Sequence, residues 1–111
     1  MTRYLISFDD GAMAVPAAEL PAVADAAHAV VREAKDAGVF VLAGGLADHT
    51  EVSVVGTDGT VTDGPVSKAY LGGLTVVEVP TREEALKWAA KLAVACRCAQ
   101  EVREFLDDPD L

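Results

Sequence analysis

The residues of this sequence with the clearest capacity for acid–base chemistry are an aspartate and a histidine that stand side by side. Asp48 and His49 follow an apolar segment near the middle of the chain. A histidine can act as a general base because its ordinary pKa lies close to neutral pH. Adjacent side chains of an extended segment point to opposite faces, so the two would not line one cavity together. We take Asp48 and His49 as the catalytic candidates; the alternative for His49 is an exposed loop histidine.

Three further residues are candidates for binding a ligand: Asp63, Lys68 and Arg103. Asp63 opens an Asp-Gly-Pro turn, where its carboxylate either caps the turn or enters a pocket, and Lys68 follows that turn. Arg103 shares one face of the final strand with Glu101. The two either form an exposed salt bridge or fix a ligand carboxylate at the rim of the fold. The second histidine, His28, lies on the charged side of a helical segment and is interpreted as a surface residue.

The chain has only two cysteines, Cys96 and Cys98. In the extended segment expected here, both would point to one face, which is a poor geometry for a mutual disulfide. A closed zinc site needs four ligands, and no second Cys or His pair has ligand spacing. No Ser-His-Asp spacing, phosphate loop, zinc signature or flavin motif is present in the sequence. We therefore expect small, reduced, structural thiols, and no metal or other cofactor.

Length and composition predict one globular domain that does not bind nucleic acid. Hydrophobic residues make up 51% of the 111 residues, which excludes disorder, and aromatic residues only 5%, so Ala, Val and Leu must build the core. Eighteen acidic residues against nine scattered basic ones give a formal net charge of −9, the wrong sign for contacts with phosphates. The sequence has neither an apolar run long enough to span a bilayer nor a signal-peptide core. We expect a cytoplasmic protein without membrane contact.

Hydrophobic periodicity and turn residues predict the elements that must position these side chains. The expected order is strand 3–9, helix 21–37, strand 39–43, hairpin strands 51–55 and 60–62, strand 71–79, a helix that starts at Thr81, and strand 96–105. Thr81 and Glu84 form the pattern of a capping box, the strongest helix-start signal in the chain. Gly44 and Gly45 are expected to interrupt the strand before them.

The middle hairpin has a turn signal of its own. Asp58-Gly59 suits a two-residue type I′ turn, and Val52 and Val54 alternate with polar residues, which predicts that both face inward. The charged residues 107–111 form a short acidic tail.

This order, βαββαβ with an inserted hairpin, predicts an α+β ferredoxin-like fold with two helices on one face of an antiparallel sheet. The apolar run of residues 71–79 is interrupted only by Thr75 and Glu78, which predicts a strand buried on both faces. Something must therefore cover the face of the sheet that the helices leave open. A second copy of the same sheet is the expected cover, which predicts a homodimer.

Several of these segments together resemble one family. Asp63-Gly64-Pro65, Gly72-Gly73 with its valine-rich strand, the helix of residues 81–89 and Glu101-Val102-Arg103 are similar, in this order, to the DGPF branch of the YCII-related proteins. The resemblance covers nearly the whole chain and implies a single domain, residues 1–106, that forms a dimeric α+β barrel. The family's biochemical role is poorly defined. Relatives of this branch tend to accompany extracytoplasmic-function sigma factors, which implies an accessory role linked to transcription.

The resemblance also bears on single residues. In the enzyme-like members, a histidine on the first helix pairs with an aspartate beyond the second strand. The histidine position falls on Ala27 here, one place before His28, and Asp48 matches the aspartate. After Asp-Gly-Pro, Val66 stands where the family commonly has Phe, and Lys68 corresponds to the family's lysine.

Two functions follow from these observations. The first is a dimeric module that binds a small ligand or a protein partner. The second is an enzyme for a small molecule that uses Asp/His general acid–base chemistry in the cavity between sheet and helix.

Overall fold

The computed structural model describes residues 1–65 and 68–111. Its elements are β1 (Thr2–Asp9), the 3₁₀ helix η1 (Ala17–Glu19), α1 (Leu20–Asp36), β2 (Phe40–Gly45), the 3₁₀ helix η2 (His49–Glu51), β3 (Ser53–Val55), β4 (Val61–Asp63), β5 (Leu71–Val79), α2 (Arg82–Cys96) and β6 (Glu101–Glu104). Val66, the residue in the family's Phe position, lies outside the described residues.

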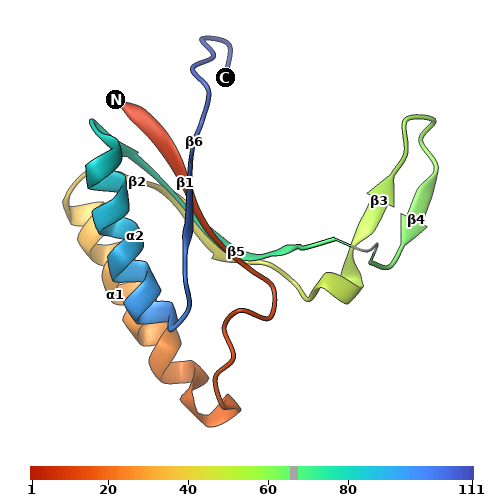
Figure 1. Ribbon diagram of the computed structural model, residues 1–111, viewed down its shortest axis with the longest axis horizontal. Helices are drawn as coiled ribbons and strands as arrows, with labels where there is room; N and C mark the ends of the chain where they lie inside the picture. The colour runs from red at the N-terminus through yellow and green to blue at the C-terminus, as the bar shows by residue number, and fades with distance from the viewer. Residues whose placement is uncertain (66–67) are drawn as a thin grey trace.

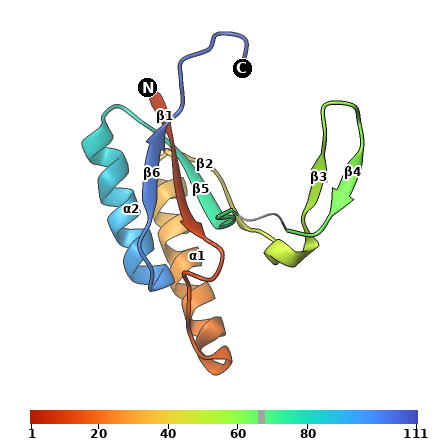
Figure 2. The ribbon, with the colours of Figure 1, turned by 45° about the vertical axis from the view of Figure 1, so that its right-hand side comes forward.

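The described residues form a four-stranded sheet in the order β2-β5-β1-β6, with every neighbouring pair antiparallel, and a separate hairpin of β3 and β4. Helices α1 and α2 lie side by side on one face of the sheet, and the hairpin projects away from them (Figures 1 and 2). This is the predicted α+β ferredoxin-like arrangement with an inserted hairpin. In the described part of the chain, no helix combines the length and apolarity that crossing a bilayer requires.

The core lies between the sheet and α2. Tyr4 and Ile6 of β1 pack with Val77 and Val79 of β5, and each of the four is at most 5% exposed. From α2, the small residues Ala85 and Ala89 and the larger Leu92 complete the cluster. Alanines allow the helix to approach the sheet closely, so a core with few aromatic rings can still be densely packed.

The two most local predictions are confirmed. Strand β5 spans Leu71–Val79, as predicted from its apolar run and the turn signals on either side. Thr81 has extended backbone angles, and its side chain accepts a hydrogen bond from the backbone N–H of Glu84 at 3.2 Å, as an N-cap residue does. The expected interruption at Gly44 and Gly45 is wrong: both belong to β2 and pair with Leu74 and Gly73 of β5.

The predicted strand 96–105 begins too early. Helix α2 continues to Cys96, and Arg97, with a left-handed φ of 56°, ends it. The cause is burial: Leu92, Ala95 and Cys96 are all buried, so the apolar spacing of the helix continues through the first cysteine. Cys96 and Cys98 therefore do not share a face of a strand. Both are free thiols.

The middle hairpin also differs from the prediction. The backbone N–H of Gly59 donates to the Gly56 carbonyl, and the N–H of Gly56 donates to the Thr60 carbonyl. Among the turn residues, Gly59 alone has a positive φ (85°). A two-residue type I′ turn requires positive φ at both central positions, so the connection is longer, with the glycine in the left-handed position. Val54 is 37% exposed, so it does not face inward: the hairpin has no core beneath it.

One face of the sheet lacks a helical layer. Cross-strand partners share a face, and the pairs Leu5–Val76, Ser7–Leu74 and Leu42–Val76 lie on the face opposite Tyr4, Ile6 and Val77. Both helices lie on the other side (Figure 2). Leu42 remains 50% exposed there.

Loss of the Thr81 cap will destabilise α2. We expect Thr81→Ala to lower the free energy of unfolding by about 1 kcal/mol, because the N–H of Glu84 loses its acceptor. Urea denaturation measures the effect. Thr81→Ser keeps a hydroxyl acceptor and is the control; an equal loss in both variants would contradict the capping role.

The two thiols will react slowly. Burial raises the pKa of the Cys96 thiol, with a smaller contribution from the neighbouring Cys98, and burial alone raises that of Cys98. A higher pKa leaves less thiolate at any given pH, and the thiolate is the reactive form. The pH profile of iodoacetamide alkylation should therefore be displaced to higher pH than the profile of the same chain unfolded in urea. Coinciding profiles would show that neither thiol is protected.

Candidate functional site

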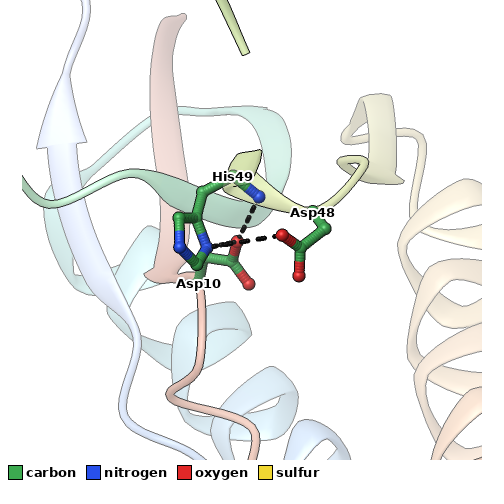
Figure 3. Close-up of side chains that lie close together, drawn as sticks. All are labelled: Asp10, Asp48 and His49. Atoms are coloured by element: carbon green, nitrogen blue, oxygen red, sulfur yellow. Dashed lines mark hydrogen bonds and ion pairs between the residues drawn. The ribbon is translucent and has the colours of Figure 1, made fainter. Parts of the chain in front are cut away.

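Three potential ligand or proton-transfer groups meet at the end of the sheet where β1 and β2 finish. The Nδ1 atom of His49 lies 2.9 Å from Asp10 Oδ2 and 3.7 Å from Asp48 Oδ1 (Figure 3). The backbone N–H of His49 donates a second hydrogen bond to the same Asp10 oxygen at 2.8 Å. Asp10 therefore holds both the backbone and the ring of His49.

The sheet topology explains why such distant residues meet. Strands β1 and β2 are both antiparallel to β5, so they run in the same direction and end at the same edge. Asp10 follows β1 directly, and its backbone N–H donates to the Tyr70 carbonyl at 2.7 Å, which continues the ladder past the end of the strand. Asp48 and His49 follow β2. The site is thus built from the chain segments just beyond two strand ends.

The assumption of an extended segment at Asp48 and His49 is wrong. Asp48 is the N-cap of the short helix η2, and its Oδ1 accepts the backbone N–H of Thr50 at 2.8 Å. This hydrogen bond lowers the pKa of the Asp48 carboxyl. The helical turn brings Asp48 and His49 to the same side, toward Asp10 (Figure 3). The cluster is accessible: the side chains of Asp10, His49 and Asp48 are 25%, 46% and 60% exposed.

A shallow hollow of about 390 Å³ adjoins the cluster. Its lining includes Asp48, His49, Lys68 and Tyr70. The rings of His49 and Tyr70 stack with centroids 6.3 Å apart, and Lys68 Nζ lies 4.8 Å from the centroid of the Tyr70 ring. Lys68, predicted to bind a ligand, thus shares this hollow with the two catalytic candidates.

The other two predicted ligand-binding residues lie elsewhere. Asp63 is in the β3–β4 hairpin, where its Oδ1 accepts a hydrogen bond at 2.6 Å from the hydroxyl of Ser53, its cross-strand partner. Arg103 is exposed on β6, opposite Leu5 in the register, and lines neither hollow described here. The residue that the sequence reasoning missed is Asp10, which directly follows β1.

A larger cavity of about 560 Å³ lies between α1 and the sheet, away from the Asp10 cluster. Apolar side chains from the sheet, the loop after β1 and both helices line it: Phe8, Met13, Leu20, Val23, Val31, Phe40 and Leu92. His28 and Lys35 of α1 also line it, and so does Ala27, the position onto which the helix histidine of the enzyme-like members falls. The interpretation of His28 as a plain surface residue is therefore incomplete: it is exposed, but at a cavity wall.

The two places differ in the chemistry that they support. At the sheet end, a carboxylate orients an imidazole, an arrangement that can transfer protons or ligate a cation. The cavity instead offers an apolar volume with a few polar groups, which is typical of sites for small organic molecules.

Comparison with known proteins gives a match to one family model and to no individual curated protein. The family model described as the YCII-related domain matches residues 2–107, which is nearly the entire sequence and includes every strand and helix of the sheet and its covering layer. The chain therefore belongs to the YCII-related family.

Proposed function

We propose that this YCII-related protein is a binding module for a small molecule with an apolar body and an acidic group, held in the cavity between α1 and the sheet. The observation that carries the proposal is the composition of that cavity's wall. Its volume of about 560 Å³ is that of a small-molecule site, in the range of roughly 300–1,000 Å³.

The apolar part of the wall supplies the driving force for binding. Phe8 and Phe40 from the sheet line the cavity together with Val23 and Val31 from α1. Burial of apolar ligand surface against these side chains contributes roughly 25 cal/mol per Å². The wall also contains Cys96, whose thiol is kept neutral by its raised pKa and therefore adds no charge.

The charge of the wall selects the polar end of the ligand. Lys35 and His28 line the cavity, and none of its described lining residues is Asp or Glu. This is notable in a chain whose acidic residues outnumber basic ones by 18 to 9. The two basic residues lie two turns apart on the same side of α1. Lys35 Nζ lies 5.3 Å from the centroid of the Phe40 ring, so its ammonium group is held beside the apolar wall, where it can pair with a carboxylate.

Acid–base catalysis by Asp48 and His49 is the second candidate function. The Asp10–His49 hydrogen bond favours it, since a carboxylate that orients an imidazole is a recurring catalytic arrangement. Against it, Asp48 and His49 do not line the large cavity, and the hollow that they do line is shallow. A small-molecule substrate bound in the cavity would therefore not be adjacent to these groups.

The proposal includes a homodimer formed through the open sheet face. Leu5, Leu42 and Leu74 supply exposed apolar surface there, and a second sheet is the cover that fits a sheet face of this kind. The resemblance to the DGPF branch supports the same assembly as a dimeric α+β barrel. That resemblance also supports an accessory role beside a sigma factor. A sigma-factor gene next to the coding sequence would support this role.

Decanoate is a suitable probe of the cavity, with decanol as its uncharged analogue. We expect decanoate to bind, measured by calorimetry below its micelle-forming concentration, and to bind more tightly than decanol. Lys35→Met should weaken decanoate binding by at least about tenfold and leave decanol unaffected, because a charge-assisted contact contributes on the order of 1.5–3 kcal/mol and about 1.4 kcal/mol is tenfold. Lys87→Met, at an exposed site on the outer side of α2, is the matched control.

A cavity-filling substitution tests the location of binding. Ala27→Phe places a ring in the cavity and should abolish binding of both probes, whereas Ala29→Phe, at an exposed position of the same helix, should not. Equal binding by the two variants would refute the cavity as the site.

Sedimentation tests the dimer. We expect a species of twice the 11.5 kDa chain mass at micromolar protein. The expected interface buries more than about 1,200 Å² in total, which is enough for a stable dimer. Leu42→Lys should produce monomers, because it places a charge in the apolar interface. Leu86→Lys, at a comparably exposed leucine (39%) on α2, should leave the dimer intact. A folded wild-type monomer would exclude this assembly.

A further inference from the structure

The Asp10, Asp48 and His49 cluster has a use that is independent of the cavity. The three side chains each offer one ligand atom, and these atoms all lie within 4.8 Å of one another. They come from two segments that are distant in sequence and are joined only by the fold. We propose that they bind a divalent transition-metal cation, best represented by Zn²⁺, with one imidazole nitrogen and two carboxylate oxygens as ligands.

The distances between the ligand atoms support coordination of one ion. Zinc lies about 2.0–2.2 Å from nitrogen and oxygen ligands, so two ligands are about 3.0 Å apart at a right angle and about 3.4 Å apart at a tetrahedral angle. Nδ1 of His49 lies 2.9 Å from Asp10 Oδ2 and 3.7 Å from Asp48 Oδ1. The two measured separations lie on either side of the tetrahedral value. Asp48, the most exposed of the three, can complete the site by a small rotation of its side chain.

Backbone groups already orient the ligands. The N–H of His49 donates to Asp10 Oδ2 at 2.8 Å, and the N–H of Thr50 donates to Asp48 Oδ1 at 2.8 Å. Hydrogen bonds of this kind fix the position of ligating carboxylates and strengthen metal binding. The positions are therefore set by the turns after β1 and β2 rather than by the metal itself.

Charge and ligand type select the class of cation. The two carboxylates provide two negative charges, and their only ion-pair partner among the described residues is His49 itself. A mixed set of one nitrogen and two oxygens suits a borderline ion such as Zn²⁺, whereas Ca²⁺ takes six to eight oxygen ligands. The exposed side chains leave the remaining coordination positions open to water. Binding would replace the proton that His49 Nδ1 shares with Asp10, so a metal-bound His49 could not also act as a base through that atom.

The experiment uses the untagged full chain and Zn²⁺ alone, titrated in competition with a chromogenic chelator. We expect one Zn²⁺ per chain with a dissociation constant in the micromolar range or below, equivalent to about 8 kcal/mol. His49→Ala and Asp48→Asn should each weaken binding by at least about tenfold. His28→Ala, which removes the other histidine, and Asp58→Asn, which alters another aspartate whose carboxylate accepts a backbone N–H, should not. Ca²⁺ should not compete.

The thiols provide the main alternative binding site, and the design separates them. Co²⁺ binding to the wild-type chain should give no thiolate-to-cobalt charge-transfer absorption, and replacing Cys96 and Cys98 by alanine should leave the Zn²⁺ affinity unchanged. Binding that persists in His49→Ala, thiolate absorption with Co²⁺, or no stoichiometric Zn²⁺ at 100 µM would each overturn the proposal. None of these results bears on decanoate binding in the cavity, so the two proposals are tested separately.

Discussion

The antiparallel pairing of β5 with both β1 and β2 is the constraint on which the rest of this structure depends. Strand β5 pairs with eight residues of β1 on one side and with β2 on the other, and most of its side chains are buried. Because both partners oppose it, they end at the same edge, next to the start of β5. The ladder continues beyond the strands, since the N–H groups of Asp10 and Leu46 donate to the carbonyls of Tyr70 and Gly72. These bonds place the loops that carry Asp10 and His49.

The same strand shapes the cavity through a missing side chain. A Cβ atom built on Gly73 would lie 2.6 Å from Cζ of Phe8, which is closer than two such atoms can approach. Glycine at this position therefore allows the Phe8 ring to lie across β5. Phe8 in turn forms part of the cavity wall. The Gly-Gly pair that helps to identify the family in the sequence thus has a packing role, in addition to its place in the β5–β2 ladder.

Local signals in the sequence were sufficient for some features and insufficient for others. The limits of β5 and the cap at Thr81 depend on neighbouring residues alone, and both were predicted correctly. The end of α2 depends on whether Cys96 is buried by the sheet, which its own neighbours do not reveal, so the last strand was placed too early. The Asp-Gly-Pro signal at Asp63 predicted a turn but not the contact of its carboxylate, which accepts a hydrogen bond from Ser53 on the neighbouring hairpin strand, ten residues earlier in the sequence.

Asp10 illustrates a different limit. It is 39 residues from His49 in the sequence, and no spacing rule connects them. The predicted βαββαβ order nevertheless contained the information, because in a ferredoxin-like sheet the first two strands of the chain flank the same neighbour in the same direction. Applying that topology to the polar residues after each strand would have placed Asp10 beside Asp48 and His49. The fold was therefore predicted from this sequence, but Asp10 was missed because the predicted topology was not used to place the polar residues that follow each strand.

The two proposed sites use the charge of the chain in opposite ways. With a formal net charge of −9, the protein attracts cations and repels anions before either reaches a site. This long-range field favours arrival of a divalent ion at Asp10 and Asp48, and it opposes an acidic ligand approaching Lys35. Screening over about 8 Å at physiological ionic strength removes most of the field outside the protein, but a contact inside the cavity is screened less. Binding of an acidic molecule must therefore depend on apolar burial with the ammonium group as a local selector, and binding of a cation on the carboxylates themselves. Added salt should accordingly weaken the second interaction more than the first, which makes the two sites separable by physical behaviour as well as by position.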